Sequence, residues 1–194
     1  MATSLLEALT DEFRGVKDLA ALTGPHTPHW VGGLAVPPHW HHLTVTDAQV
    51  LLSPARVLGW QPRPDHEWEA TDTVEVYSYT GIPVFDDVYH STASTLDDLD
   101  ARDLRTQLLA MPARTGVLAE RSTALVAVEG RPIWTQLTHY VAGSEQPHAG
   151  RLIVHTLYAA EHYHRELTSD IAILTASVYD TVTNMLTARG QLDC

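Results

Sequence analysis

The chain has 194 residues, 44% of them hydrophobic and 19% charged, so it is long enough to bury a core and too apolar for an intrinsically disordered protein. Lysine and arginine number 12 against 24 acidic residues, and the formal net charge of −12 argues against nucleic acid as a partner, since phosphate contacts need a basic surface. No apolar run approaches the roughly 18 residues of a membrane span, and no positively charged signal segment is visible, so the expected location is the cytoplasm.

The first segment, from Ser4 to about Leu22, is predicted to form an amphipathic helix. Apolar residues recur in it at intervals of three and four, and the stripe includes Leu5, Leu9, Phe13 and Val16. Gly24 and Pro25 then supply a helix stop. Such a stripe has to be covered by the chain's own sheet, by a second copy or by another protein.

Residues His26 to His42 have the composition of an irregular, extended arm rich in proline and glycine. The arm also carries five histidines: His26, His29, His39, His41 and His42. Imidazole is a common metal ligand, but this kind of backbone supplies no rigid ligand geometry by itself. A metal site in the arm therefore stays open, and an exposed, histidine-rich arm is the favoured interpretation.

Beyond the arm, the segments Leu43 to Leu58 and Thr73 to Tyr79 are predicted strands, and the second shows a clear period of two. Gly59 to Asp65 is predicted to be the loop between them. A helix is predicted from Leu96 to Met111, because a pattern resembling a capping box precedes leucines at helical spacing and Pro112 follows them.

The second half is predicted to be a run of antiparallel strands closed by a helix. The strand patterns are Leu118–Val128, Ile133–Val141, Leu152–Tyr158 and, after a turn at Glu161-His162, Tyr163–Thr168. Apolar residues from Leu174 to Met185 then predict a C-terminal helix. The sequence therefore predicts an α+β fold, a mostly antiparallel sheet flanked by helices, divided into a helix and arm (residues 1–42) and a domain (residues 43–194).

Three motifs, which lie within roughly residues 36 to 190, follow a known order. They are Pro37-Pro38-His39-Trp40, Glu129-Gly130-Arg131-Pro132-Ile133 and the segment Thr156 to Thr168. With them the chain resembles the PsbP-like superfamily, an α/β/α sandwich, and within it the actinobacterial LpqN-type proteins. The resemblance implies a protein that binds other proteins or serves as an accessory subunit. LpqN-type proteins carry a lipidated N-terminal cysteine, whereas the one cysteine here is Cys194.

Tryptophans outside the predicted strands are candidates for contact with a protein partner. They are Trp30, Trp40, Trp60 and Trp68, and the apolar stripe of Leu5, Leu9, Phe13 and Val16 joins them as a candidate interaction surface. Tryptophan is enriched at binding hot spots because it buries a large area at a small entropic cost. The alternative is that these side chains fold back onto the core.

The last predicted hairpin suggests a second kind of site. Its alternation places His155, His164 and Glu166 on one face, and two histidines with a carboxylate form a metal-binding set. The same pattern is equally typical of a plain solvent-facing strand.

Motifs for nucleophilic catalysis and for phosphate binding are lacking, and no cofactor is expected. The sequence therefore predicts a non-enzymatic accessory or adaptor protein that binds a protein partner or a second copy, and a small-ligand or metal-binding protein is the alternative.

Overall fold

The computed structural model describes residues 15–44, 54–84, 86, 88, 89, 95–97 and 99–188. Its strands are β1 (Val16–Ala21), β2 (Trp40–His42), β3 (Arg56–Trp60), β4 (Ala70–Gly81), β5 (Arg102–Leu108), β6 (Val117–Val128), β7 (Arg131–Ala142) and β8 (Gly150–Ala160). Its helices are η2 (Gly24–His26), α2 (His29–Gly32), α4 (Glu161–His164) and α5 (Thr168–Ala188). The predicted α+β class is confirmed.

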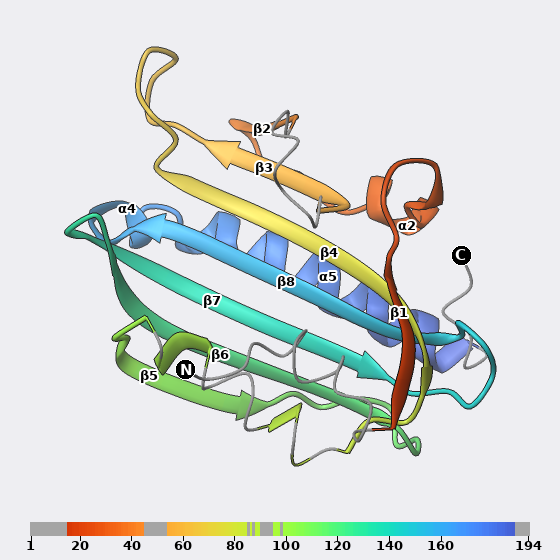
Figure 1. Cartoon of the computed structure of the whole chain (residues 1–194). Coiled ribbons are helices and arrows are strands. Elements are labelled where there is room, and N and C mark those ends of the chain that lie inside the picture. The colour runs from red at the N-terminus through yellow and green to blue at the C-terminus, as the bar shows by residue number, and fades with distance from the viewer. Residues whose placement is uncertain are drawn as a thin grey trace.

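One twisted antiparallel sheet, in the order β2-β3-β4-β8-β7-β6-β5, runs through the molecule, and α5 lies behind it (Figure 1). β4 has two neighbours on its outer edge. β3 pairs with its first part, and β1 pairs with its last part. Over the described residues, the segment predicted as a helix and arm (residues 1–42) therefore contributes β1 and β2 to the same sheet as the predicted domain.

The two faces of the sheet have different coverings. The helix face packs against α5, and its core includes Val74, Tyr140 and Ile153 together with Val178 and Val182 of the helix. The front face is turned toward the viewer in Figure 1, and its core includes Tyr77, Tyr79, Leu137, Leu152 and Val88. Both faces are buried, which explains why β8 is apolar almost throughout rather than alternating.

The predictions for the second half are largely confirmed. The strand patterns at Leu118–Val128, Ile133–Val141 and Leu152–Tyr158 lie within β6, β7 and β8, and the last helix is α5. The predicted strand Thr73–Tyr79 lies within β4. These elements are long and strongly periodic, and hydrophobic periodicity predicts such elements best.

The prediction of a helix from Ser4 to Leu22 is wrong over the described part of that segment. Residues 15–44 are described, and Val16–Ala21 form strand β1 on the edge of β4. Gly15 and Gly81 allow this pairing, because a β-carbon at Gly81 would lie 1.8 Å from the Gly15 carbonyl oxygen. Leu5, Leu9 and Phe13 lie outside the described residues.

The prediction of a helix from Leu96 to Met111 is also wrong, since Arg102–Leu108 form β5 beside β6. The helical turn at Leu96 stops early. Asp100 has a φ of 51°, and the amides of Asp100 and Ala101 donate to the carbonyls of Asp97 and Leu96. This is the hydrogen-bond pattern of a helix C-terminus with a left-handed cap, so the following leucines pack as strand residues.

The prediction of a strand from Tyr163 to Thr168 is wrong, since this segment holds the end of α4, a turn and the first residue of α5. Tyr163, Leu167, Ile171 and Leu174 recur at intervals of three and four, and successive amides donate back along this series, from Leu167 to Tyr163 and from Ile171 to Leu167. The apparent alternation of period two was part of a helical pattern.

The predicted loop Gly59–Asp65 and the predicted strand Leu43–Leu58 need a smaller correction. Gly59 and Trp60 belong to β3, which begins only at Arg56, and residues 45–53 lie outside the described part. Within the described residues, no helix is both long and apolar enough to cross a lipid bilayer.

Candidate functional site

A cavity of about 350 Å³ opens at the end of the sheet where β4 begins and β8 ends. Its apolar lining includes Trp68, Tyr158, Val128 and Ile133. Three of these side chains are unusually exposed for their size, namely Trp68 (41%), Tyr158 (39%) and Val128 (52%). We call this feature the Trp68 cavity. A concave, mostly apolar surface of this volume is typical of a binding site.

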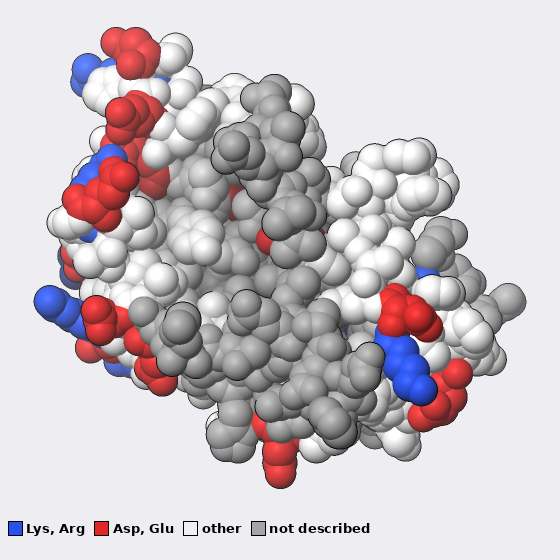
Figure 2. All heavy atoms as spheres, in the orientation of Figure 1, with Lys and Arg blue, Asp and Glu red and all other residues white. Residues whose placement is uncertain are grey.

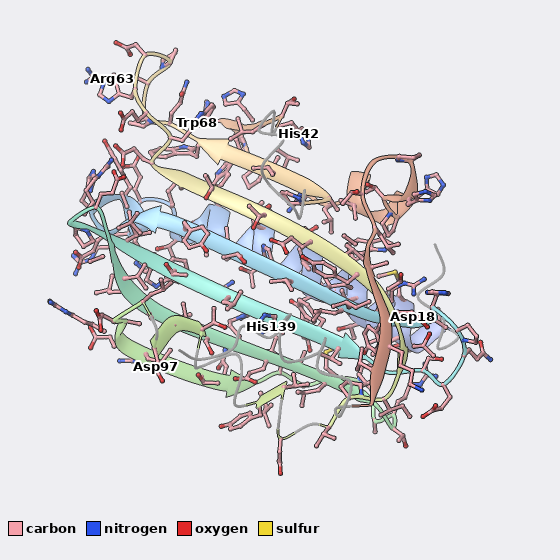
Figure 3. The ribbon with its side chains drawn as sticks, in the orientation of Figure 1. Asp18, His42, Arg63, Trp68, Asp97 and His139 are labelled. Carbon is pink, nitrogen blue, oxygen red and sulfur yellow. The ribbon has the colours of Figure 1, made fainter. Side chains whose placement is uncertain are left out.

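The position of the Trp68 indole requires a glycine at position 59 of β3. A β-carbon at Gly59 would lie 2.6 Å from Cε3 of Trp68 and 2.7 Å from Cδ1 of Leu43, so only glycine lets the indole lie against β3. His41, which pairs with Gly59 across the two strands, contacts the indole with ring centroids 6.3 Å apart. Figure 3 shows Trp68 at the base of the β3–β4 loop, with Arg63 toward the tip.

The rim of the cavity is charged. Arg131 forms an ion pair of 2.7 Å with Glu69 and a longer one of 3.5 Å with Glu67, and Glu129 also lines the cavity. Figure 2 shows acidic and basic side chains close together at this end of the molecule. The rim therefore holds three carboxylates against one guanidinium, and the cavity mouth is net acidic.

Further along the front face, Glu75 of β4 is a half-buried acidic group. Burial raises the pKa of Glu75, while a hydrogen bond donated by the Tyr77 hydroxyl opposes that rise. Burial and the charge of Glu75 together raise the pKa of the Tyr158 hydroxyl. Tyr158, which lines the cavity, therefore lies close enough to Glu75 to be affected by its charge.

The helix face holds a buried polar cluster at its centre. Asp72 accepts a hydrogen bond of 2.7 Å from Nη2 of Arg56 and one of 2.6 Å from Nε2 of His155, and all three side chains are almost fully buried. Because a carboxylate only accepts hydrogen bonds, Nε2 of His155 carries the hydrogen. Arg56 also donates to the carbonyl of Ala35 at 3.2 Å, which fastens the chain before β2 to the sheet.

The predicted metal set is not assembled. His155 is buried and bonded to Asp72, His164 lies in α4 and stacks on Trp134 with centroids 4.3 Å apart, and Glu166 is exposed beyond it. The second strand of the expected hairpin does not form, because the end of α4, a turn and the start of α5 take its place, so the strand face that was expected to align the three residues is absent. The five arm histidines are all exposed, and no cluster of three metal-binding side chains occurs among the described residues.

The structure separates the predicted partner-binding residues into two groups. Trp40, Trp60 and Val16 are buried within their own chain, and Trp30 is partly buried beside the helix-face core. The indole of Trp40 donates to Asp170 of α5 at 3.0 Å. Only Trp68 among the predicted tryptophans is exposed.

His139 occupies the front face near the middle of β7 (Figure 3) and directly opposes Glu120 of β6. Burial holds the pKa of His139 at about 3, well below its ordinary 6.5. Between those values the unfolded chain binds a proton that the folded chain does not bind. Stability therefore falls as the pH falls through this window, by up to about 1.4 kcal/mol per pH unit.

We expect His139→Gln to flatten this pH dependence. The free energy of unfolding, measured by urea titration between about pH 7 and pH 5, should decrease less steeply in the variant than in the wild type, because the unfolded state loses one titrating group. His42→Gln, a change at an exposed position on β2, should leave the slope unaltered. Parallel slopes for His139→Gln and the wild type would contradict the burial of a neutral histidine.

Comparison with known proteins identifies the fold alone. No protein-family model and no curated protein matches the chain. Among solved structures, LpqN of Mycobacterium tuberculosis, described as involved in cell envelope biogenesis, is similar with a TM-score of 0.63 and 13% identity over 88% of this chain and 93% of that one. A Pseudomonas aeruginosa protein of unknown function, PA94, matches with a TM-score of 0.43 and 13% identity, over 71% and 95% of the two chains, which is too low to carry an argument. The predicted resemblance to LpqN-type proteins is thus confirmed at the level of the fold.

Sequence reasoning identified Trp68 but not the residues that surround it. In the sequence, Tyr158 and Arg131 belong to motifs that indicate the fold, and Val128 is the end of a predicted strand. Exposed aromatic residues at strand ends are the signal that would have found Tyr158, but which strand ends meet is a property of the sheet order.

Proposed function

We propose that this protein is a non-enzymatic binding protein that recognises a protein partner at the Trp68 cavity. The observation that carries the proposal is the cluster of exposed Trp68, Tyr158 and Val128 around a preformed hollow. Aromatic residues at the centre of a patch with a charged rim are the usual anatomy of an interface hot spot. Membership of the PsbP-like superfamily and a cytoplasmic location stay predictions from the sequence.

The chemistry of the cavity favours one kind of partner segment. The floor accepts an apolar or aromatic side chain, and the three carboxylates of Glu67, Glu69 and Glu129 outnumber Arg131 at the rim. The whole chain carries a net charge of −12, which steers cationic partners toward it. The favoured partner presents an apolar anchor flanked by lysine or arginine.

Site-specific photo-crosslinking in cells that naturally make the protein tests the proposal. Trp68→p-benzoylphenylalanine should give a defined crosslinked species, whereas the same analogue at Ile173 should not give it. Ile173 is a matched control, because it is an α5 residue of similar exposure, 44%. The same crosslink from both positions, or none from position 68, would refute the proposed surface.

Binding of the purified, crosslinked partner should then depend on the cavity itself. We expect Trp68→Ala to weaken the complex roughly thirtyfold or more, as for a hot-spot residue. Gly59→Ala should also weaken it, because the added methyl group displaces the indole while leaving it in the protein. An affinity unchanged by both substitutions would show that the captured protein binds elsewhere.

A further inference from the structure

A second concave surface lies on the helix face, between α5 and the edge strand β5. It comprises a groove of about 500 Å³ and an adjoining pocket of about 180 Å³, and Arg121 lines both. The groove walls are mainly apolar and include Leu109, Ala110, Ile171, Ala172, Ala176 and Tyr179. We call the two together the α5–β5 groove.

Two arginines gather at the pocket end of this groove. Arg105 of β5 pairs with Thr123, and Arg121 of β6 pairs with Gln107, so both arginines project from the same face on adjacent strands. A one-residue bulge between Arg102 and Arg105, where Asp103 has a φ of 54°, keeps Arg102 in register on that face as well. The bulge therefore gathers positive charge along one edge of the groove.

These two arginines lack carboxylate partners within the described part of the chain. Arg56 and Arg131 form ion pairs there, whereas Arg105 and Arg121 form none. Arg121 donates a long hydrogen bond, 3.4 Å, to the Thr138 hydroxyl and also interacts with the buried Tyr140 hydroxyl, and neither of these groups carries a negative charge. In a chain with a net charge of −12, two neighbouring guanidinium groups that form no ion pair are suited to hold an external anion.

The floor of the groove is polar and fixed. Gln136, only 5% exposed, donates through Nε2 to the Thr175 hydroxyl of α5 at 2.9 Å. The Tyr179 hydroxyl donates to the Ala110 carbonyl and ties the helix to the segment after β5. Both contacts fix the position of α5 relative to the sheet. The side chains of Ala172 and Ala176 are small, and this leaves the groove open between α5 and β5.

We propose that the α5–β5 groove binds a small amphipathic anion. Its acidic group, a carboxylate, sulfonate or phosphate, is held by Arg105 and Arg121 in the pocket, and its apolar body lies along Ala172, Ala176 and Leu109. This site is separate from the Trp68 cavity, which lies on the front face at the end of the sheet.

A pair of fluorescent probes tests the proposal on the full chain. Anilinonaphthalene sulfonate is an apolar aromatic body with one sulfonate, and phenylnaphthylamine is the same body without it. We expect the sulfonate probe to bind more tightly. Arg105→Gln/Arg121→Gln should weaken it about tenfold to hundredfold, since charge-assisted hydrogen bonds are lost, and should leave the affinity of phenylnaphthylamine unchanged.

Three further variants locate the probe. Ala176→Trp, at an exposed helix position, should fill the groove and abolish binding of both probes. Arg63→Gln removes the same charge from a distant exposed loop, and Trp68→Ala alters the other cavity, so both should bind the probes like the wild type. The proposal is overturned by equal affinities for the two probes, by unchanged sulfonate binding in the double arginine variant, or by unchanged binding in Ala176→Trp.

Discussion

Replacing Asp72 by alanine is expected to lower the free energy of unfolding by about 3–5 kcal/mol, the range for breaking a buried ion pair from one side. Asp72 is fully buried and accepts from both Arg56 and His155. Without it, the Arg56 guanidinium stays in the core without a counter-charge. Urea unfolding, with the midpoint and slope compared to the wild type, measures the loss.

A surface carboxylate provides the matched control. Glu67 pairs with Arg131 at 3.5 Å, but its side chain is 85% exposed, so Glu67→Ala should change stability by less than about 1 kcal/mol. Arg56→Met/Asp72→Leu should be more stable than Asp72→Ala, because it removes both charges and restores apolar volume. If Asp72→Ala costs no more than Glu67→Ala, the cluster is accessible to water and the proposed burial is wrong.

Trp40→Ala is the second substitution with a large expected effect, about 3–5 kcal/mol of destabilisation. The indole is 5% exposed and packs in the core cluster with Leu58, Leu157 and Leu174. Its Nε1 also donates to Asp170, so the substitution leaves both a cavity and an unpaired carboxyl group. Thermal and urea unfolding of the purified variant measure the loss.

The stability of Trp68→Ala, compared with that of Trp40→Ala, distinguishes an exposed tryptophan proposed for binding from a buried one that stabilises the fold. Because Trp68 is 41% exposed, its replacement should cost about 1 kcal/mol or less, although it removes the same side chain. Trp40→Phe should fall between the two, since it retains most of the apolar contact and loses the hydrogen bond. Equal destabilisation by Trp40→Ala and Trp68→Ala would contradict the assignment of Trp40 to the core and of Trp68 to the surface.

The periodicity of apolar residues was sufficient to predict secondary structure wherever an element is long and its period is unambiguous. The alternation in β4 and the turn at Glu129-Gly130 between β6 and β7 follow from side-chain periodicity and backbone preference alone. Gly130 and Glu129 both have positive φ, at 78° and 50°, as a tight hairpin turn requires. The antiparallel order of the second half followed from these short connections.

The same periodicity gave the wrong secondary structure where pairing with a neighbouring strand outweighs a local helical preference. Leucines from Leu96 to Leu108 have helical spacing, yet residues 102–108 satisfy their backbone hydrogen bonds on β6. Val16–Ala21 do the same on β4. In both cases the decisive hydrogen bonds come from another strand, the next one along the chain for β5 and a strand more than 50 residues away for β1, and the helical spacing within the segment itself does not reveal that strand.

The sequence by itself determined the acidic balance, the α+β class, four of the strands and the closing helix, because composition and periodicity act within one segment. Only the tertiary structure decided which tryptophan is exposed, joined Asp72 to Arg56 and His155, and placed Arg105 beside Arg121. Sheet order and register bring those side chains together, and both depend on pairing between strands up to about 90 residues apart, as in Ala70 with Ala159.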